Sequence, residues 1–256
     1  MNNSASCVVT NYATLHITSS GVLTNGGNIT NQAAGTLNDT GLFTNNNSVD
    51  NAGTFNIGAG KIFNNNGLVT NSGSLNDNGT FNHNAGASLI NSDTFTIGSN
   101  GKLFVIGSTV TNTGTVTVQF LLEIKSGGTF TNQASAVLTN NGQVLVFDTL
   151  SLLSNAGTID NGAFLNNFSN GGVTNEGIFN NKSTGSTDNN GFFINMAGDT
   201  IQNDGTFNNA SSTPMLNHGI LLNSVTGIFQ NNATLTNNGS LTNNGTVHNN
   251  SSKTIN

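Results

Sequence analysis

Apolar residues recur along this chain at short, nearly regular intervals. Between Leu23 and Leu103 they are separated by steps of 6 or 8 residues. Three successive steps add up to about 20 residues, a period marked by Val49, Val69 and Leu89. A fixed period of this length is the signature of a protein built from stacked repeats. The sequence therefore predicts a repeat architecture along almost the whole chain.

Each apolar position lies in a unit of the form Gly-x-apolar-x-Asn, as in residues 239–243 and 245–249. If the unit is a β-strand, the apolar residue points inward together with the Gly and the Asn, and the two x positions, often Thr, point outward. The Asn amide is then placed to bond the turn and to stack into an amide ladder along the axis. Asn-Gly pairs such as Asn66-Gly67 and Asn238-Gly239 predict sharp corners in which the Gly supplies a positive φ.

The number of sides follows from the volume of the core. Grouping the apolar steps by twos gives a flat ribbon of 12 to 14 residues per coil, whereas grouping by threes gives a triangular coil of about 20. Facing Phe rings would overlap in the flat ribbon, and overpacking is costly. We therefore predict an all-β fold, a single-stranded parallel β-helix (β-solenoid) with three sides. It would be one domain, residues 1–256, of roughly 12 rungs without evident capping domains, and about 55–60 Å long at about 4.8 Å per rung.

The predicted core consists of three columns of inward side chains, one on each side of the triangle. The core ladder is best defined at Phe43, Phe63 and Phe81 in the first column, Val49, Val69 and Leu89 in the second, and Phe55, Leu75 and Phe95 in the third. Farther along the chain, the same spacing assigns Phe164 to the first column and Leu150 to the second.

Composition narrows the class of function. Only 6% of the residues are charged, against about 25% in an average globular protein. The regular apolar residues, including 16 Phe, distinguish the chain from a disordered one. A net charge of −6 without a basic cluster argues against nucleic acid as a partner. No apolar run is long enough to predict a membrane span.

Candidate catalytic and metal-binding groups are sparse. Acid–base catalysis on a β-helix needs carboxylates on neighbouring rungs, and only Glu176 and Asp199 have a suitable separation, 23 residues. Because Glu176 follows one strand and Asp199 precedes another, we expect them on different parts of the coil. No metal-ligand spacing connects the four histidines, which are His16, His83, His218 and His248. We therefore expect no cofactor and no enzymatic activity.

Outward Thr residues suggest one further possibility. Thr-x-Thr units, as in Thr109–Thr111 and Thr129–Thr131, resemble the flat Thr arrays of β-solenoid ice-binding proteins. Asp50 and Ile90 interrupt the outward positions of the second column, and the β-propensity of Thr explains its frequency without ice.

Three segments resemble a known family: residues 21–31 (GVLTNGGNITN), 67–77 (GLVTNSGSLND) and 233–249 (ATLTNNGSLTNNGTVHN). Their tandem Gly-x-apolar-x-Asn units resemble the β-helical shafts of filamentous-haemagglutinin-type adhesins and related bacterial surface fibres. This resemblance implies a right-handed parallel β-helix, a location outside the cell or on its surface, and an adhesive or scaffolding role. The chain departs from that family at its N-terminus, where no secretion-type cap domain and no signal peptide are visible. The alternative fold is a left-handed helix of hexapeptide repeats, which the irregular steps and the core Phe disfavour.

Solenoids need caps over their terminal strands, and here the apolar pattern continues from Val9 to Ile255 without one. Either the chain is part of a longer repeat protein, or subunits stack end to end into a filament. For the second case the predicted end-to-end interface contains Val9, Leu15, Val247 and Ile255, and the partners are copies of the same chain.

Residues 119–124 and 144–153 place apolar side chains on both faces of their strands. They indicate either packing under a side loop or a patch for lateral contact, with Phe120, Leu121, Leu145 and Phe147 as its members. Together these observations predict a structural β-solenoid, the shaft of an extracellular fibre that associates with itself. The alternative is an adhesin, with a glycan or cell surface as its partner, or an ice-binding module, which would use the outward Thr and Asn faces.

Overall fold

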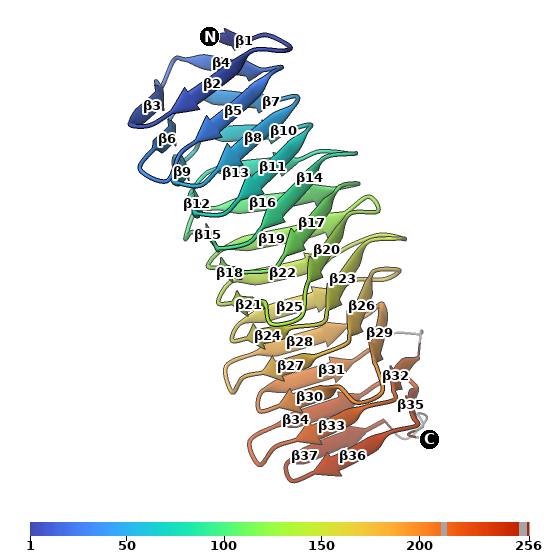
Figure 1. Ribbon diagram of the computed structural model, residues 1–256. Coiled ribbons are helices and arrows are strands. Elements are labelled where there is room, and N and C mark those ends of the chain that lie inside the picture. Colours follow the sequence, from blue (N-terminus) through green and yellow to red (C-terminus); the bar gives the residue numbers. More distant parts are fainter. Residues whose placement is uncertain (211–213, 251–254, 256) are drawn as a thin grey trace.

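Strands of mostly four residues alternate with short corners in the computed structural model, which describes residues 1–210, 214–250 and 255. Every third strand returns to the same side of the molecule, so the strands stack into three parallel sheets along one elongated body (Figure 1). Aligned residues in successive coils are about 20 apart, as in the series Val49, Val69 and Leu89. The three-sided parallel β-solenoid is therefore confirmed, with about twelve coils.

The three sheets, named here A, B and C, share the strands in rotation. Sheet A contains β1 (Asn2–Asn3), β4 (Val22–Asn25), β7 (Leu42–Asn45), β10 (Ile62–Asn65), β13 (Thr80–His83), β16 (Lys102–Ile106), β19 (Leu121–Lys125), β22 (Gln143–Val146), β25 (Phe164–Asn167), β28 (Ser186–Asn189), β31 (Thr206–Asn209), β34 (Ile228–Asn231) and β37 (Thr246–Asn249). Sheet B contains β2 (Val8–Asn11), β5 (Asn28–Asn31), β8 (Ser48–Asn51), β11 (Leu68–Asn71), β14 (Ser88–Asn91), β17 (Thr109–Asn112), β20 (Thr129–Asn132), β23 (Leu152–Asn155), β26 (Gly172–Asn175), β29 (Phe192–Asn195), β32 (Met215–Asn217) and β35 (Leu235–Asn237). Sheet C contains β3 (Thr14–Ile17), β6 (Thr36–Asp39), β9 (Thr54–Ile57), β12 (Ser74–Asp77), β15 (Thr94–Ile97), β18 (Thr115–Val118), β21 (Val137–Asn140), β24 (Thr158–Asn161), β27 (Ile178–Asn181), β30 (Thr200–Asn203), β33 (Ile220–Asn223) and β36 (Ser240–Asn243).

The four positions of a strand alternate between outside and inside, as the side-chain period of a strand requires. In β10, for example, Phe63 and Asn65 are buried, whereas Ile62 and Asn64 face outward. The second position carries the apolar core and the fourth position usually carries Asn. The Gly-x-apolar-x-Asn unit is therefore one corner residue followed by one strand.

The glycines of the Asn-Gly corners have a different role from the one expected. Gly67 and Gly239 do not have positive φ values. An added Cβ at either position would instead overlap a carbonyl oxygen of the preceding coil, that of Asn47 or Gly219 respectively. Gly is required at these corners because successive coils approach each other closely there.

All nine residues of the predicted core ladder are fully buried. Phe rings from two sides of the triangle meet in the interior, since Phe63 lies 4.7 Å from the ring centroids of both Phe43 and Phe81 and 5.1 Å from that of Phe55. Tilted and edge-on ring pairs at such distances stabilise a core beyond simple burial. The second column supplies the smaller side chains Val49 and Val69, which leave room for these rings.

Two predicted core positions are wrong. Leu165, not Phe164, is aligned with the buried Val144, and Phe164 faces outward. Leu153, not Leu150, is aligned with Phe130, and Leu150 is 82% exposed in a corner. The error at Leu150 follows from the five-residue corner 147–151 between β22 and β23, which shifts the start of β23 along the sequence.

Candidate functional site

A ladder of buried Asn side chains joins successive coils inside the solenoid. In sheet B it runs from Asn11 to Asn237, and each Nδ2 donates to the Oδ1 of the aligned Asn in the next coil at 2.6–2.8 Å. The same Nδ2 also donates to a backbone carbonyl of the next coil, as from Asn31 to Thr54 at 3.0 Å. The predicted Asn ladder is thus confirmed, and these amides satisfy the general rule that buried polar groups are hydrogen-bonded.

The inner ladders have a direction. In every inner amide pair of the described chain the earlier coil donates and the later coil accepts, as from Asn25 to Asn45 and from Asn161 to Asn181. The second bond from Nδ2 to a carbonyl fixes this orientation, because Oδ1 cannot donate. An outer Asn ladder on sheet C has the reverse direction, since Asn56 donates to Asn38 at 2.8 Å. The inner ladders of a coil therefore present amide acceptors on one end face and amide donors on the other.

The inner ladder of sheet A is interrupted in the middle of the molecule. His83 ends its first part: His83 Nδ1 accepts from Asn65 Nδ2 at 3.0 Å, and His83 Nε2 donates to the carbonyl of Thr109 at 2.9 Å. These are two of the three contacts that an inner Asn makes elsewhere, so His83 is a structural residue. Burial lowers its pKa from 6.5 to about 4, so the imidazole is neutral. The next three coils have aliphatic residues at this position: Val105, Ile124 and Val146.

In sheet C the first half of the corresponding column alternates Ile with Asp. Asp39 and Asp77 are fully buried, and the Oδ2 atom of each has no hydrogen-bond partner. Their Oδ1 atoms accept from the backbone N–H groups of Gly41 and Gly79. Burial raises the pKa of Asp39 to about 6 and that of Asp77 to about 7 from an ordinary value of 3.8, because desolvation disfavours the charged carboxylate.

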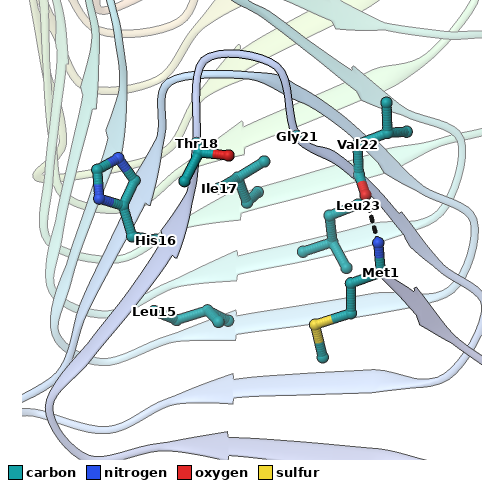
Figure 2. Close-up of a pocket in the computed structure, with 8 residues that line it drawn as sticks. All are labelled: Met1, Leu15, His16, Ile17, Thr18, Gly21, Val22 and Leu23. Carbon is teal, nitrogen blue, oxygen red and sulfur yellow. Dashed lines mark hydrogen bonds between the residues drawn. The ribbon is translucent and has the colours of Figure 1, made fainter.

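The first coil contains a cavity of about 200 Å³ between sheets A and C (Figure 2). The apolar side chains of Leu15, Ile17, Leu23 and Met1 line it, and the Met1 amino group donates to the Val22 carbonyl at 2.6 Å.

Of the four residues of the predicted end-to-end interface, Val9, Leu15 and Val247 are partly buried against the core. The fourth, Ile255, is 37% exposed and forms a parallel bridge with Leu235.

The predicted lateral residues lie together on sheet A. Leu121 and Leu145 occupy outward positions of the neighbouring strands β19 and β22, and Phe147 follows β22 at the corner. Phe120 precedes β19, is 40% exposed and has the Lys102 Nζ 5.9 Å from its ring centroid. These side chains lie on the outer surface of the sheet, where Leu121, Leu145 and Phe147 are partly exposed.

The carboxylates Glu176 and Asp199 are closer than expected. Both lie in corners that connect sheet B to sheet C, on successive coils. The pKa of Asp199 is raised by burial and, to a smaller degree, by the charge of Glu176. The expectation that they occupy different parts of the coil is wrong. In the part of the chain that the structure describes, no three His, Cys, Asp or Glu side chains are grouped so that they could hold a metal ion.

The outward Thr residues are most regular on sheet C, a face that the sequence did not single out. The first outward position is Thr14, Thr36, Thr54, Ser74, Thr94 and Thr115 in six successive strands, until Val137 interrupts the series.

Among residues 1–210, 214–250 and 255 there is no helix with the length and apolar character that spanning a membrane demands.

Comparison with known protein families gives no match, and no curated protein sequence matches. Among solved structures, the chain is similar to the crystal structure of a TibC-catalysed hyper-glycosylated TibA fragment, residues 55–350. The two are 17% identical, with a TM-score of 0.35, and the similarity covers 98% of this chain and 97% of the fragment. At this identity and TM-score the similarity adds nothing to what the fold itself shows, and the chain is assigned to no family.

Proposed function

We propose that this chain is a segment of the rigid shaft of an extracellular fibre, extended head to tail by copies of the same chain. The observation that carries this proposal is the common direction of the inner Asn ladders. A head-to-tail contact would place the Nδ2 donors of one end face against the Oδ1 acceptors of the other. A head-to-head contact would oppose acceptor to acceptor, so only polar growth continues the ladders.

The apolar side chains support the same geometry. Leu15 and Val9 cover one end of the core, and Leu241 and Val247 cover the other. All four are only partly buried, in contrast to the fully buried residues between them. A further coil would remove their remaining surface from water, which is the main favourable term in most protein association. Backbone pairing would add to it, because the edge of a parallel sheet is a template for another strand.

The function proposed here is mechanical, not catalytic. Three continuous sheets, one uninterrupted amide ladder and a continuous core tie each coil to its neighbours, which favours stiffness along the axis. The location outside the cell rests on the resemblance of the Gly-x-apolar-x-Asn units to adhesin shafts. Exposure of the native protein to an added protease on intact cells tests this location.

Electron microscopy and sedimentation velocity over a series of protein concentrations test the assembly. We expect rods that lengthen with concentration in steps of about 55–60 Å. The end-face variant Val9→Glu/Leu15→Glu should stop growth by placing charges in the contact, because unpaired buried charges are strongly disfavoured. Thr10→Glu, which changes an outward residue of the same strand, is the matched control and should still form long rods. Rods of one length at all concentrations would overturn the proposal.

A second candidate function, ice binding or adhesion, is favoured by the Thr column of sheet C. Six successive strands place a hydroxyl at the same position of a flat face, which is more regular than the face of sheet B. Thermal hysteresis measured on the purified chain tests ice, with Thr54→Tyr and Thr94→Tyr as disrupting variants. Binding to a glycan array tests adhesion. A freezing point equal to that of the buffer and an array without signal would exclude both.

A further inference from the structure

Four successive coils of sheet A carry apolar side chains on their outer surface. Elsewhere on this sheet, β4 and β10 each expose one apolar side chain, Val22 and Ile62, and β31 faces solvent with Thr206 and Asn208. Between β16 and β25 half of these positions are apolar, and further apolar residues lie in the corners that follow β22 and β25. The sheet A patch is defined here by six residues: Phe104, Leu121 and Leu145 in the strands, and Phe147, Leu150 and Phe168 in the corners. An organised apolar surface of this kind marks an interaction site in many soluble proteins.

The aromatic residues of the patch are held in defined positions. The rings of Phe147 and Phe168 stack with centroids 4.1 Å apart and an interplanar angle of 10°. Lys125 Nζ lies 4.6 Å from the centroid of the Phe104 ring and also pairs with Glu123 at 2.6 Å. Because these side chains are fixed before any partner arrives, little conformational entropy is lost on binding.

Leu150 adds an independent observation. Its φ is +71° and its side chain is 82% exposed, in the corner between β22 and β23. A bulky residue rarely adopts this left-handed conformation, and its water-exposed side chain gains no burial in return. Backbone strain of this kind persists where the surrounding structure enforces it and is common at binding sites. The corner therefore holds an apolar side chain outward at a conformational cost.

The charges of the patch indicate its partner. Lys102 and Lys125 lie on its first two coils, and Asp148 lies in the corner of the third, where its Oδ2 accepts from the N–H of Ser126 at 3.4 Å. A surface made for anions would carry one sign of charge only. Lys125 is paired with Glu123 on its own coil, and Asp148 adds a negative charge on the next coil, so a reversed copy would bring Asp148 against the positive end of this pair.

We propose that the sheet A patch binds the same patch of a second copy of this chain, with the two solenoids side by side and antiparallel. A two-fold axis across the shafts places the coil of Lys125 opposite the partner coil of Asp148, twice in each pair. A two-fold axis along the shafts would instead place each coil opposite the same coil of the second copy. Lys125 would then face the Leu121 end of β19 in that copy. The lateral contact does not depend on head-to-tail growth, and it adds a second direction of assembly.

The pair is expected to be weak. Four coils at about 4.8 Å extend about 19 Å along the shaft. This length is short for an interface of standard size, which buries about 800 Å² on each partner. Sedimentation velocity at increasing concentration, in the Val9→Glu/Leu15→Glu background, separates lateral pairs from end-to-end growth. We expect a monomer–dimer equilibrium in this background, whether or not the head-to-tail proposal holds.

Variants test the surface and the orientation. Phe147→Ser/Leu150→Ser should raise the dimer dissociation constant by about tenfold or more. Val225→Ser, which changes an equally exposed apolar residue (80%) in a distant corner, should leave it unchanged. Lys125→Asp should weaken the dimer, and Lys125→Asp/Asp148→Lys should restore it. Thermal unfolding of each variant controls for folding. A monomer at all concentrations, an equal loss with Val225→Ser, or no recovery in the double variant would overturn the proposal.

Discussion

The coils from β16 to β22 and the coils from β25 to β34 have the same strands and register but fill their inner corners differently. In the earlier coils the fourth position of sheet A is aliphatic, whereas in the later coils it is Asn in all three sheets. Both solutions bury the position completely. The difference shows that a corner can be filled by a fully bonded amide network or by apolar side chains. Either kind is stable where the neighbouring coils carry the same kind at that position.

The borders between these regions are where the two solutions meet. At the first border His83 accepts from Asn65 and donates to the Thr109 carbonyl, so the last amide of the ladder is paired. At the second border Asn167 follows Val146, and the buried Oδ1 of Asn167 has no hydrogen-bond partner. The aliphatic region also coincides with the apolar outer surface of sheet A. The buried fourth positions and the outer positions of sheet A thus become apolar in the same coils, in the middle of the solenoid.

The largest effect is expected at Asp77, which is neither an amide nor aliphatic. Its folded pKa of about 7 lies above the ordinary 3.8, so its stabilising contribution is complete below pH 4 and is lost as pH rises through 7. The difference of about three pH units corresponds to about 4 kcal/mol. Asp77→Asn should therefore raise the urea midpoint at pH 7.5 and reduce its pH dependence.

Asp39→Asn should act in the same direction over a narrower range, since the pKa of Asp39 is raised only to about 6. Asp50→Asn, at an exposed position of sheet B, is the control. Equal pH profiles of Asp77→Asn and the parent chain would show that Asp77 is not neutral in the folded state.

Replacing an inner Asn by an aliphatic residue, or an inner aliphatic residue by Asn, should lower the free energy of unfolding by about 3 kcal/mol. Asn189→Leu removes the bonds with Asn167 and Asn209 and leaves buried amide groups unpaired. Ile124→Asn introduces a buried amide between Val105 and Val146, neither of which can bond it. Urea unfolding followed by circular dichroism measures both. Ile124→Val, which keeps the corner aliphatic, should cost about 1 kcal/mol.

His83→Asn should change stability by about 1 kcal/mol or less at pH 7.5, since Asn can make the same two contacts. The two residues differ in acid. The folded pKa of His83 is about 4, below the ordinary 6.5, so its contribution is complete above pH 6.5 and is lost as pH falls through 4. As pH rises, His83 increases the unfolding free energy over this range, whereas Asp39 and Asp77 decrease it. Without His83 the unfolding free energy should therefore fall more steeply as pH rises from 4 to 6.5, and an unchanged slope would contradict a neutral His83.

The smallest effect is expected for the outer Asn ladder of sheet C. Asn56 is only partly buried and bonds Asn38 and Asn76 where water can replace either partner. Asn56→Ala should cost about 0.5 kcal/mol or less. A loss as large as that of Asn189→Leu would remove the distinction between inner and outer amides.

Much of the core could be predicted from spacing because one residue type recurs at one position of a repeated strand. The two errors occurred where this signal was ambiguous. Phe164 and Leu165 both precede an Asn by two residues, and alignment with Val144 and Val146 selected Leu165. Leu153 was recognisable from Leu153-Ser154-Asn155, a complete apolar-x-Asn unit, whereas Leu150 is not followed by Asn at that spacing.

The sequence by itself determined that this chain is a stacked β-solenoid with an amide ladder, because the repeated unit encodes both the strand and its contacts with identical units above and below. Only the tertiary structure decided the direction of the ladder, the raised pKa values of Asp39 and Asp77, and the gathering of Phe104, Phe147 and Phe168 on one face. These properties depend on which residues become neighbours across coils about 20 residues apart. A side chain is charged, bonded or exposed according to those neighbours, and the repeat period does not specify them.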